Sequence, residues 1–274
     1  MDGKINSKNM RILLVLLLLF NFSFSQVKLL SWNIENLGKS KSEETITYIA
    51  NTIKDYDVIA IQEVVAGFGG AQAVAKLADE LNRTGAKWDY VVSAPTTGSS
   101  YKSERYAFLW KPSKVKFKGK PWLEVKYRIE IDREPFFATF EYQGKEFTVV
   151  NFHAITKNMQ PETEIKYFKY FFDEYHNLNL FFVGDFNCPQ SHSVFNPWRK
   201  KEYLPVFVNQ KTTLKRACKN QVCLVSEFDN IWYSQEKIEV LKSEAVLFYE
   251  DFETLENART VSDHIPLGVT FNLK

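Results

Sequence analysis

Cysteine and histidine are scarce, with three cysteines and four histidines among 274 residues. A structural zinc site usually draws on two closely spaced pairs of such residues. Cys188 and His192 are four residues apart, but no second pair completes a zinc pattern with them, which argues against a zinc-finger type of domain. Cys218 and Cys223 are close enough in the sequence to close a short disulfide loop in an exported protein. Cys188 is then left over.

Long apolar runs are almost absent as well. The run Ile12 to Phe20 is too short to span a membrane as a helix. A basic stretch precedes it and small residues follow at positions −3 and −1 of a cleavage site: Lys4, Lys8 and Arg11, then Ser23 and Ser25. We predict a secretory signal peptide over residues 1–25, with an uncleaved N-terminal anchor as the alternative. The protein is then exported, periplasmic or extracellular, and keeps no membrane span.

An excess of either charge is also lacking. The formal net charge is +2, and residues 1–25 hold three basic side chains and one acidic side chain, which leaves 32 of each sign in the remaining chain. Proteins that bind nucleic acid without specificity usually carry a clear basic excess. Any attraction to phosphate must therefore be local or assisted by a metal ion.

Apolar patterning predicts one domain over residues 26–274 in which strands and helices alternate, with no internal repeat and no low-complexity linker. The expected helices cover 43–54, 71–81 and 162–175, with a short one opening at Asn196-Pro197, while 67–70 forms a loop. The expected strands cover 27–34, 57–61, 89–94, 106–110, 136–142, 146–152, 178–183, 229–233, 240–249 and 265–271. Two of them form a hairpin across Gln143-Gly144, so the sheets cannot be purely parallel. The pattern suits an α/β fold in which two mixed sheets pack face to face with helices outside.

Polar side chains gather where these strands end. The apolar strand 178–183 stops at Gly184-Asp185-Phe186-Asn187, and period-2 alternation places Asp185 and Asn187 on one face. By itself this segment is equally well explained as a strand end followed by an Asx turn. The same kind of ending recurs on other strands, and the full set is Asn33, Glu63, Glu104, His153, Asp185, Asn187, Asp229, Asp263 and His264.

Each of these residues taken alone is more often a solvated surface group or a structural histidine, so their joint placement carries the interpretation. Oxygen ligands such as Glu63 and Asp263 suit a hard cation, namely Mg²⁺, Ca²⁺ or Mn²⁺. Two histidines within reach of carboxylates would supply a base and an acid. Together these are the parts needed for metal-assisted hydrolysis of a phosphate ester.

Four short motifs, in this order, resemble the endonuclease/exonuclease/phosphatase superfamily: Ser31-Trp32-Asn33-Ile34, Ile61-Gln62-Glu63-Val64, Gly184-Asp185-Phe186-Asn187 and Ser262-Asp263-His264-Ile265-Pro266. The resemblance implies a four-layered α/β sandwich with a metal-dependent phosphoesterase site. Three further segments are similar to its deoxyribonuclease I-like branch: the helix 73–82 that follows Gln62-Glu63-Val64, Glu104-Arg105-Tyr106-Ala107-Phe108 and Arg133-Glu134-Pro135-Phe136.

The resemblance also implies roles for the site residues. Glu63 looks like the principal metal ligand, with Asn33, Asp185 and Asp263 nearby. His264, paired with Asp229, looks like the group that activates the attacking water. His153, paired with Glu104, looks like the acid that protonates the leaving oxygen, and the two histidines could exchange these roles. Asn187 would orient the phosphate or the nucleophile.

Arg133 would contact a substrate phosphate, and the alternative for it is a surface ion pair. The sequence departs from the deoxyribonuclease branch at Val65, where that branch places an arginine that reaches into the minor groove. Tyr101 and Lys102 occupy the next groove-facing loop, where an aromatic ring could stack against sugar.

The sequence therefore favours an exported, monomeric endonuclease that hydrolyses DNA and needs no protein partner. The expected ion is Mg²⁺, with Ca²⁺ or Mn²⁺ as the alternatives. The alternative is a phosphatase or phosphodiesterase that acts on an inositol phosphate, sphingomyelin or another small or lipid phosphoester. Near-zero net charge and Val65 favour this alternative. A non-catalytic binding protein on the same fold would have lost site residues, and none of the nine is missing.

Overall fold

The computed structural model describes residues 26–98 and 103–274. The predicted signal peptide and the residues Tyr101 and Lys102 lie outside the described part of the chain. Among the described residues, no helix is long and apolar enough to cross a membrane.

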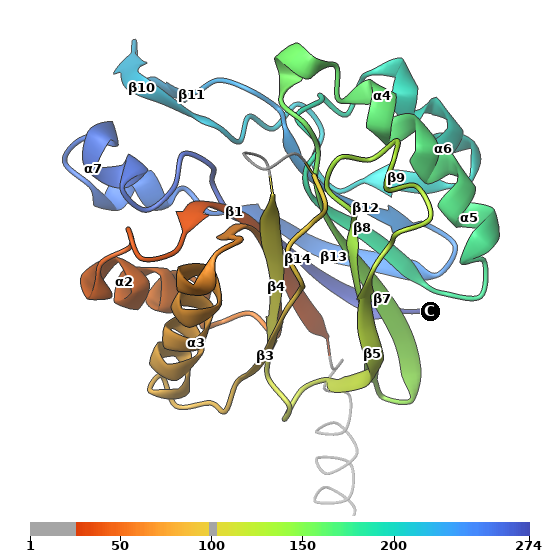
Figure 1. The fold of residues 1–274 in the computed structure, drawn as a ribbon, viewed down its shortest axis with the longest axis horizontal. Helices are drawn as coiled ribbons and strands as arrows, with labels where there is room; N and C mark the ends of the chain where they lie inside the picture. The colour runs from red at the N-terminus through yellow and green to blue at the C-terminus, as the bar shows by residue number, and fades with distance from the viewer. Residues whose placement is uncertain (1–25, 99–102) are drawn as a thin grey trace, which may run out of the picture.

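Two six-stranded sheets form the centre of the molecule (Figure 1). The first has the order β13 (Ile238–Ala245), β14 (Leu267–Leu273), β1 (Val27–Leu37), β2 (Val58–Val65), β4 (Glu104–Trp110) and β3 (Asp89–Val92). The second has the order β5 (Lys116–Leu123), β6 (Phe136–Tyr142), β7 (Lys145–His153), β8 (Leu180–Asp185), β12 (Asp229–Ser234) and β9 (Tyr203–Pro205). Each sheet is built around one parallel pair, β1 with β2 and β7 with β8, and its other neighbours pair antiparallel.

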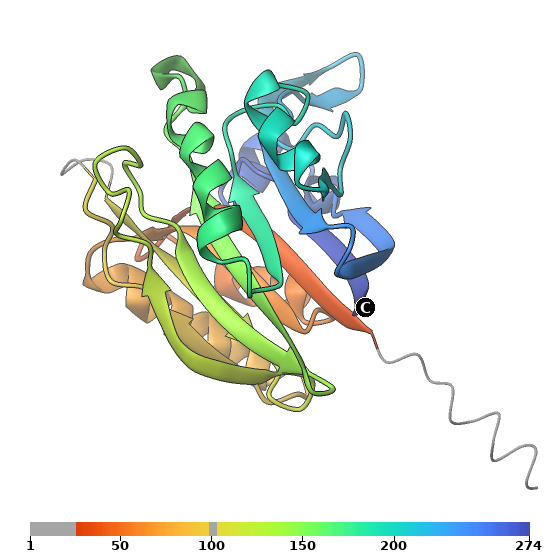
Figure 2. The ribbon, with the colours of Figure 1, turned by 90° about the vertical axis from the view of Figure 1, so that its right-hand side faces the viewer.

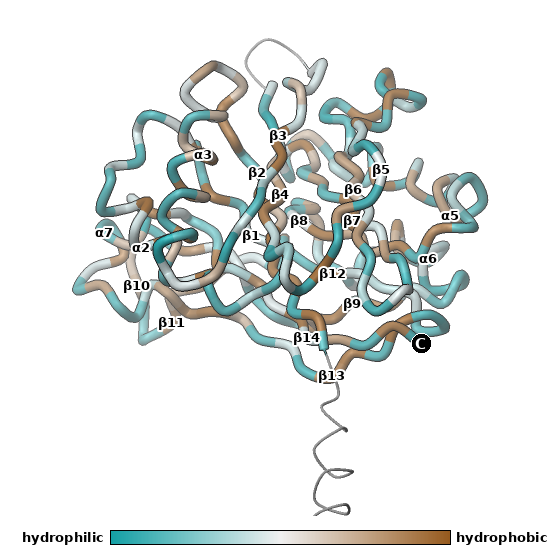
Figure 3. Tube along the Cα trace, turned by 90° about the horizontal axis from the view of Figure 1, so that it is seen from below, coloured by the Kyte–Doolittle hydropathy of each residue, from teal (hydrophilic) through white to brown (hydrophobic). Residues whose placement is uncertain are grey.

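Helices cover the outer face of each sheet (Figures 1 and 3). The helices α2 (Glu43–Ile53), α3 (Phe68–Asn82) and α7 (Leu255–Arg259) lie on the side of the first sheet. The helices α4 (Glu162–Ile165), α5 (Phe171–Glu174) and α6 (Asn196–Lys200) lie on the side of the second. Helix α2 shows the local logic: the Ser42 side chain caps its N-terminus by accepting from the Thr45 amide, and Ile46, Ile49, Ala50 and Ile53 are buried.

Three apolar cores hold these layers together. One lies between α2, α3 and the first sheet, and another lies between the second sheet and α4, α5 and α6. The central core between the sheets is rich in phenylalanine, including Phe108, Phe140, Phe147, Phe181 and Phe271. Helix, sheet, sheet and helix make four layers (Figure 1), and Figure 2 views them from the side of the second sheet and its helices. The expected α/β sandwich is confirmed.

Several predicted boundaries were wrong. The loop expected over 67–70 is helical from Phe68, with Gly67 at the N-cap. Gly70 permits this early start, because a Cβ there would lie 1.9 Å from the Val65 carbonyl oxygen. The helix expected over 162–175 is interrupted by the 3₁₀ turn η2 (Lys166–Tyr170). The strand expected over 240–249 ends at Ala245 and is followed by the 3₁₀ turn η4 (Phe248–Asp251).

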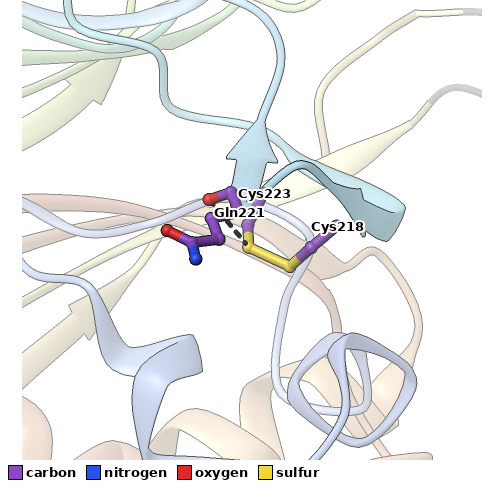
Figure 4. Close-up of a disulfide and its surroundings, with 3 residues drawn as sticks. All are labelled: Cys218, Gln221 and Cys223. Atoms are coloured by element: carbon purple, nitrogen blue, oxygen red, sulfur yellow. Dashed lines mark hydrogen bonds between the residues drawn. A yellow bond between two sulfur atoms is a disulfide. The ribbon is translucent and has the colours of Figure 1, made fainter.

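Other elements have no counterpart in the predictions: the edge strands β5 and β9, helix α7, and the 3₁₀ turns η1 (Lys157–Met159) and η3 (Ser193–Phe195). A two-stranded hairpin of β10 (Leu214–Lys219) and β11 (Val222–Leu224) was also missed. A disulfide between Cys218 and Cys223 closes this hairpin (Figure 4), which the short spacing of the two cysteines allowed. Cys188 is a free, buried thiol.

Candidate active site

The predicted site residues converge on one edge of the sandwich, where the carboxyl ends of both parallel strand pairs meet the amino ends of β4 and β12. Eight of them line one pocket: Glu63, Glu104, Arg133, His153, Asp185, Asn187, Asp263 and His264. Asn33 and Asp229 lie directly behind it through hydrogen bonds to Glu63, Asp185 and His264. Every predicted site residue is therefore part of one cluster.

Asp185, at the end of β8, is the centre of this cluster. It pairs in register with His153 of β7 on one side and with Asp229 of β12 on the other. The preceding Gly184 has φ +130°, and a Cβ there would lie 1.9 Å from the Phe152 carbonyl oxygen. Glycine is required there because it tolerates both the positive φ and the close approach of β7. Gly184 thus allows β8 to approach β7 closely, which places the carboxylate of Asp185 beside His153.

Glu63 reaches the site through a distortion of β2. The pairing register of β2 with β4 shifts between Ile61 and Val64, and Glu63 itself has φ +59°. A bulge of this kind turns a side chain away from the regular alternation. The Glu63 carboxylate accepts hydrogen bonds from the Asn33 side chain at 3.0 Å and from the Asn36 amide at 3.3 Å.

The first histidine, His153, pairs with a carboxylate from the opposite sheet. Its Nδ1 lies 2.9 Å from Oε2 of Glu104, and Nη1 of Arg133 donates to the same oxygen at 3.0 Å. Burial alone would raise the pKa of Glu104, but His153 and Arg133 outweigh burial and lower it. Burial and Arg133 lower the pKa of His153, whereas Glu104 and Asp185 raise it and prevail.

The second histidine, His264, makes the reciprocal connection between the sheets. Its Nδ1 lies 2.7 Å from Oδ2 of Asp229, which also accepts a hydrogen bond from the Thr212 hydroxyl at 2.6 Å. Burial lowers the pKa of His264, but Asp229 and Asp185 raise it well above its ordinary value. Burial and the nearby Asp185 raise the pKa of Asp229. No cation other than the imidazole hydrogen-bonds to Asp229 among the described residues.

Both imidazoles present their outer nitrogen to one oxygen atom. Nε2 of His153 lies 3.5 Å from Oδ2 of Asp185, and Nε2 of His264 lies 3.7 Å from it. On the two flanks, Nε2 of His153 is 3.9 Å from Glu63, and Nε2 of His264 is 3.8 Å from Asp263. The site is therefore two imidazoles facing each other across a group of carboxylates.

The donor set fits a divalent cation. Asp185, Asp229 and His264 offer ligand atoms within 4.8 Å of one another. Oδ1 of Asn33 is fully buried and has no hydrogen-bond partner, while its Nδ2 donates to both Glu63 and Asp185. A buried amide oxygen without a donor is costly, and turning the amide over would aim this oxygen at the carboxylates as a metal ligand. The oxygen-rich set suits a hard cation rather than a soft one.

Two predicted residues are anchored to the wall of the pocket. Arg133 is buried, so the alternative of a surface ion pair is wrong. Its Nη1 pairs with Glu104 and its Nη2 donates to the Ala154 carbonyl oxygen. The Asn187 side chain also donates to the Ala154 carbonyl, at 3.1 Å, and its backbone has φ +48°. Arg133 and Asn187 therefore share one anchor point on the wall of the pocket.

Sequence reasoning missed several supporting residues. Thr212 holds Asp229, and the Ser262 hydroxyl accepts from the His264 amide and donates to the Asn33 carbonyl oxygen. Gln62 donates to Asn151 at 2.6 Å across the two sheets, beneath the pocket. Glu35 lines the pocket, and burial with nearby Asp263 and Glu63 raises its pKa. Ser262 lies within a recognised motif and could have been found, whereas Thr212 stands in a segment without any pattern.

Comparisons with known proteins identify the family of the chain. The model of the Endonuclease/Exonuclease/phosphatase family matches residues 30–264. A deoxyribonuclease of Thioalkalivibrio sp. (strain K90mix) is 28% identical over 94% of this chain and 74% of its own length. Deoxyribonuclease-1 of Bos taurus is 29% identical over 89% of this chain and 92% of its own.

Among solved structures, the mannosyl-6-phosphatase Bt3783 of Bacteroides thetaiotaomicron has the same fold. It superposes with a TM-score of 0.65 over 90% of this chain and 99% of its own, at 17% identity. The match of the family model over most of the chain, together with the fold, leads to one assignment. The chain belongs to the endonuclease/exonuclease/phosphatase family of phosphoester hydrolases.

Proposed function

We propose that the protein is an exported, divalent-metal-dependent endonuclease that hydrolyses phosphodiester bonds of DNA. The observation that carries this proposal is the pair of carboxylate-bound imidazoles whose Nε2 atoms lie 3.5 and 3.7 Å from one oxygen of Asp185. Hydrolysis of a phosphodiester needs a base for the attacking water and an acid for the leaving alkoxide. Relatives named deoxyribonuclease, aligned along most of both chains, support DNA as the substrate.

The surroundings of the two histidines support an assignment of acid and base. Arg133 lowers the pKa of His153, whereas the main influences on His264 from the described residues are burial and the carboxylates of Asp229 and Asp185, and these two carboxylates raise its pKa further. The more basic imidazole is the better proton acceptor, and the less basic one is the better donor. We assign His264 to the water and His153 to the leaving oxygen.

The remaining residues would orient the reactants. His264 Nε2 accepts a proton from water, and Asp229 stabilises the imidazolium that results while Thr212 keeps the carboxylate in place. His153 Nε2 donates a proton to the departing oxygen, with its ring held by Glu104. Asn187 and the guanidinium of Arg133 line the pocket where they can contact the phosphate.

We assign metal binding to Glu63, Asp185, Asn33 and Asp263, with Mg²⁺ as the expected ion. When bound, such a cation would stabilise negative charge on the nonbridging phosphate oxygens and offset the carboxylates that raise the pKa of His264. The Cys218–Cys223 disulfide supports export, since such bonds persist in oxidising compartments.

One observation favours the second candidate, a phosphatase or phosphodiesterase on a small or lipid substrate. The pocket lip is formed by Val65, Ala66 and Gly67, and the next residue, Phe68, is 74% exposed. The lip thus carries the exposed phenyl ring of Phe68 and lacks a cation that would help bind the groove of DNA. Such a ring suits an acyl chain or a membrane surface.

The first test is incubation of residues 26–274 with supercoiled plasmid under three conditions: Mg²⁺, Mg²⁺ with Ca²⁺, and EDTA. We expect nicking that depends on metal and is abolished by His264→Ala. His176→Ala is the control, because His176 is exposed and does not line the pocket. Absence of cleavage with every metal would overturn the DNA proposal. Release of phosphate or choline phosphate would then be measured to test the second candidate.

A further inference from the structure

A second group of potential ligands lies outside the pocket. Glu162 of α4, Cys188 and His192 each offer one ligand atom within 4.8 Å of the others. Cys188 and His192 belong to the loop after β8, one and five residues beyond Asn187, whereas Glu162 comes from the helical layer that covers the second sheet. None of the three lines the active-site pocket. We propose that these three side chains form a zinc site that ties this loop to α4.

The chemistry of the three donors selects the metal. A thiolate, an imidazole and a carboxylate form the mixed set that Zn²⁺ accepts with tetrahedral geometry, whereas Mg²⁺ and Ca²⁺ prefer oxygen alone. One thiolate and one carboxylate together balance the charge of the ion. The site therefore adds no net charge to a region where Cys188 is buried and the other two side chains are half-buried.

An unpartnered buried atom points to the same place. Oε2 of Glu162 is inaccessible to solvent and has no hydrogen-bond partner. A carboxylate oxygen in that state has lost its hydration without compensation, and a metal ion would supply it. This observation is independent of the spacing of the three donors.

Small movements would complete the site. Donor atoms around a tetrahedral zinc ion lie roughly 3.3–3.8 Å apart, given bonds of about 2.0–2.3 Å. The three donor atoms lie within 4.8 Å of one another, so side-chain movements of about 1 Å bring them to these separations. His192 must also release its Nδ1 hydrogen bond with the Val194 amide, 3.2 Å long, because a metal-bound imidazole keeps its proton on the other nitrogen.

Binding would also expel a proton. Burial raises the pKa of the Cys188 thiol to about 11, with Lys157 acting in the opposite direction. The thiol is thus protonated in the absence of metal, and its proton passes to the buffer as the sulfur–zinc bond forms.

The test is a titration of the EDTA-treated protein with Co²⁺, which replaces Zn²⁺ and gives a sulfur-to-cobalt charge-transfer band when a thiolate binds it. Cys188 is the only cysteine outside the disulfide, so the band reports this site and not the oxygen-rich pocket. We expect a band that saturates at one equivalent and is displaced by Zn²⁺. Even second-shell changes cost metal sites about 10- to 100-fold in affinity, so His192→Ala and Glu162→Gln should weaken binding at least about tenfold.

His176→Ala is the matched control and should leave the titration unchanged. Cys188→Ser should abolish the band, and circular dichroism will establish that the variant is folded. If that variant does not fold, His192→Ala and Glu162→Gln decide the question, because both positions are half-buried. Absence of the band in the wild-type protein would overturn the proposal. So would a Co²⁺ affinity in His192→Ala and Glu162→Gln that equals the wild-type affinity. The titration does not depend on nuclease activity, so it is independent of the proposed function.

Discussion

The two histidine–carboxylate pairs look alike but are stabilised differently. Each pair joins the two sheets, since His153 of the second sheet meets Glu104 of the first, and His264, next to the first sheet, meets Asp229 of the second. Glu104 is also bound by the guanidinium of Arg133, whereas, in the part of the chain that the structure describes, Asp229 is also bound by the neutral Thr212 hydroxyl. A permanent positive charge therefore belongs to one pair only.

This difference separates the behaviour of the two pairs. Arg133 cannot lose its proton in a protein, so Glu104 remains ionised whatever the state of His153. Among the described residues, Asp229 pairs with no cation except the imidazole of His264, so the charge states of these two groups depend on each other. The charge of Glu104 in the His153 pair is thus fixed by Arg133, whereas the charge states of Asp229 and His264 change with their surroundings.

The largest expected effect is on turnover. His264→Ala and His153→Ala should each lower kcat by about 10²- to 10⁴-fold, because each removes a proton-transfer group. The fold should persist, as both side chains lie at the edge of the sandwich. Plasmid cleavage rates and circular dichroism provide the measurements. Near-normal activity in either variant would contradict the role assigned to that histidine.

Neutralising the carboxylate of each pair should have different effects on stability and on activity. Glu104→Gln removes the carboxylate that pairs directly with the buried Arg133, and we expect a loss on the order of 3 kcal/mol in the free energy of unfolding. Asp229→Asn should cost less stability, because His264 can become neutral, and should mainly reduce kcat. Urea unfolding of both variants measures the difference. Equal destabilisation would show that Arg133 does not distinguish the pairs.

The acids that flank the two histidines can locate the metal relative to the pairs. Glu63 lies near His153 and Asp263 near His264. If Glu63 is the principal ligand, Glu63→Gln should raise the Mg²⁺ concentration needed for half-maximal activity by about tenfold or more, and Asp263→Asn should raise it less. An unchanged metal requirement in Glu63→Gln would count against Glu63 as a ligand.

The smallest expected effect is the pH dependence of stability in EDTA. The pKa of His264 is raised, so its contribution is complete below about pH 6.5 and is lost as pH rises through the raised value. The pKa of Glu104 is lowered, so its contribution is present above the ordinary carboxyl range and is lost on acidification. Thermal unfolding should show Asp229→Asn flattening the alkaline decline and Glu104→Gln flattening the acid one. Wild-type-like profiles in both variants would refute the assignment.

The sequence by itself determined the fold class, the family resemblance and the membership of the site. Apolar periodicity identifies the central strands, because their burial requires apolar side chains. The strand-end motifs can be recognised because their polar side chains follow directly after apolar strands. The edge strands β5 and β9 escaped prediction, since half-exposed strands such as β5 lack a continuous apolar face.

Only the tertiary structure decided how the site residues are held. The bulge that turns Glu63, the shared Ala154 carbonyl and the pairing of Arg133 with Glu104 join residues that are distant in sequence. Glu162 likewise meets Cys188 and His192 only because α4 covers the second sheet. The local sequence pattern reflects the strand or helix to which a residue belongs. The electrostatic interaction of two side chains depends on the distance between them, which tertiary packing sets.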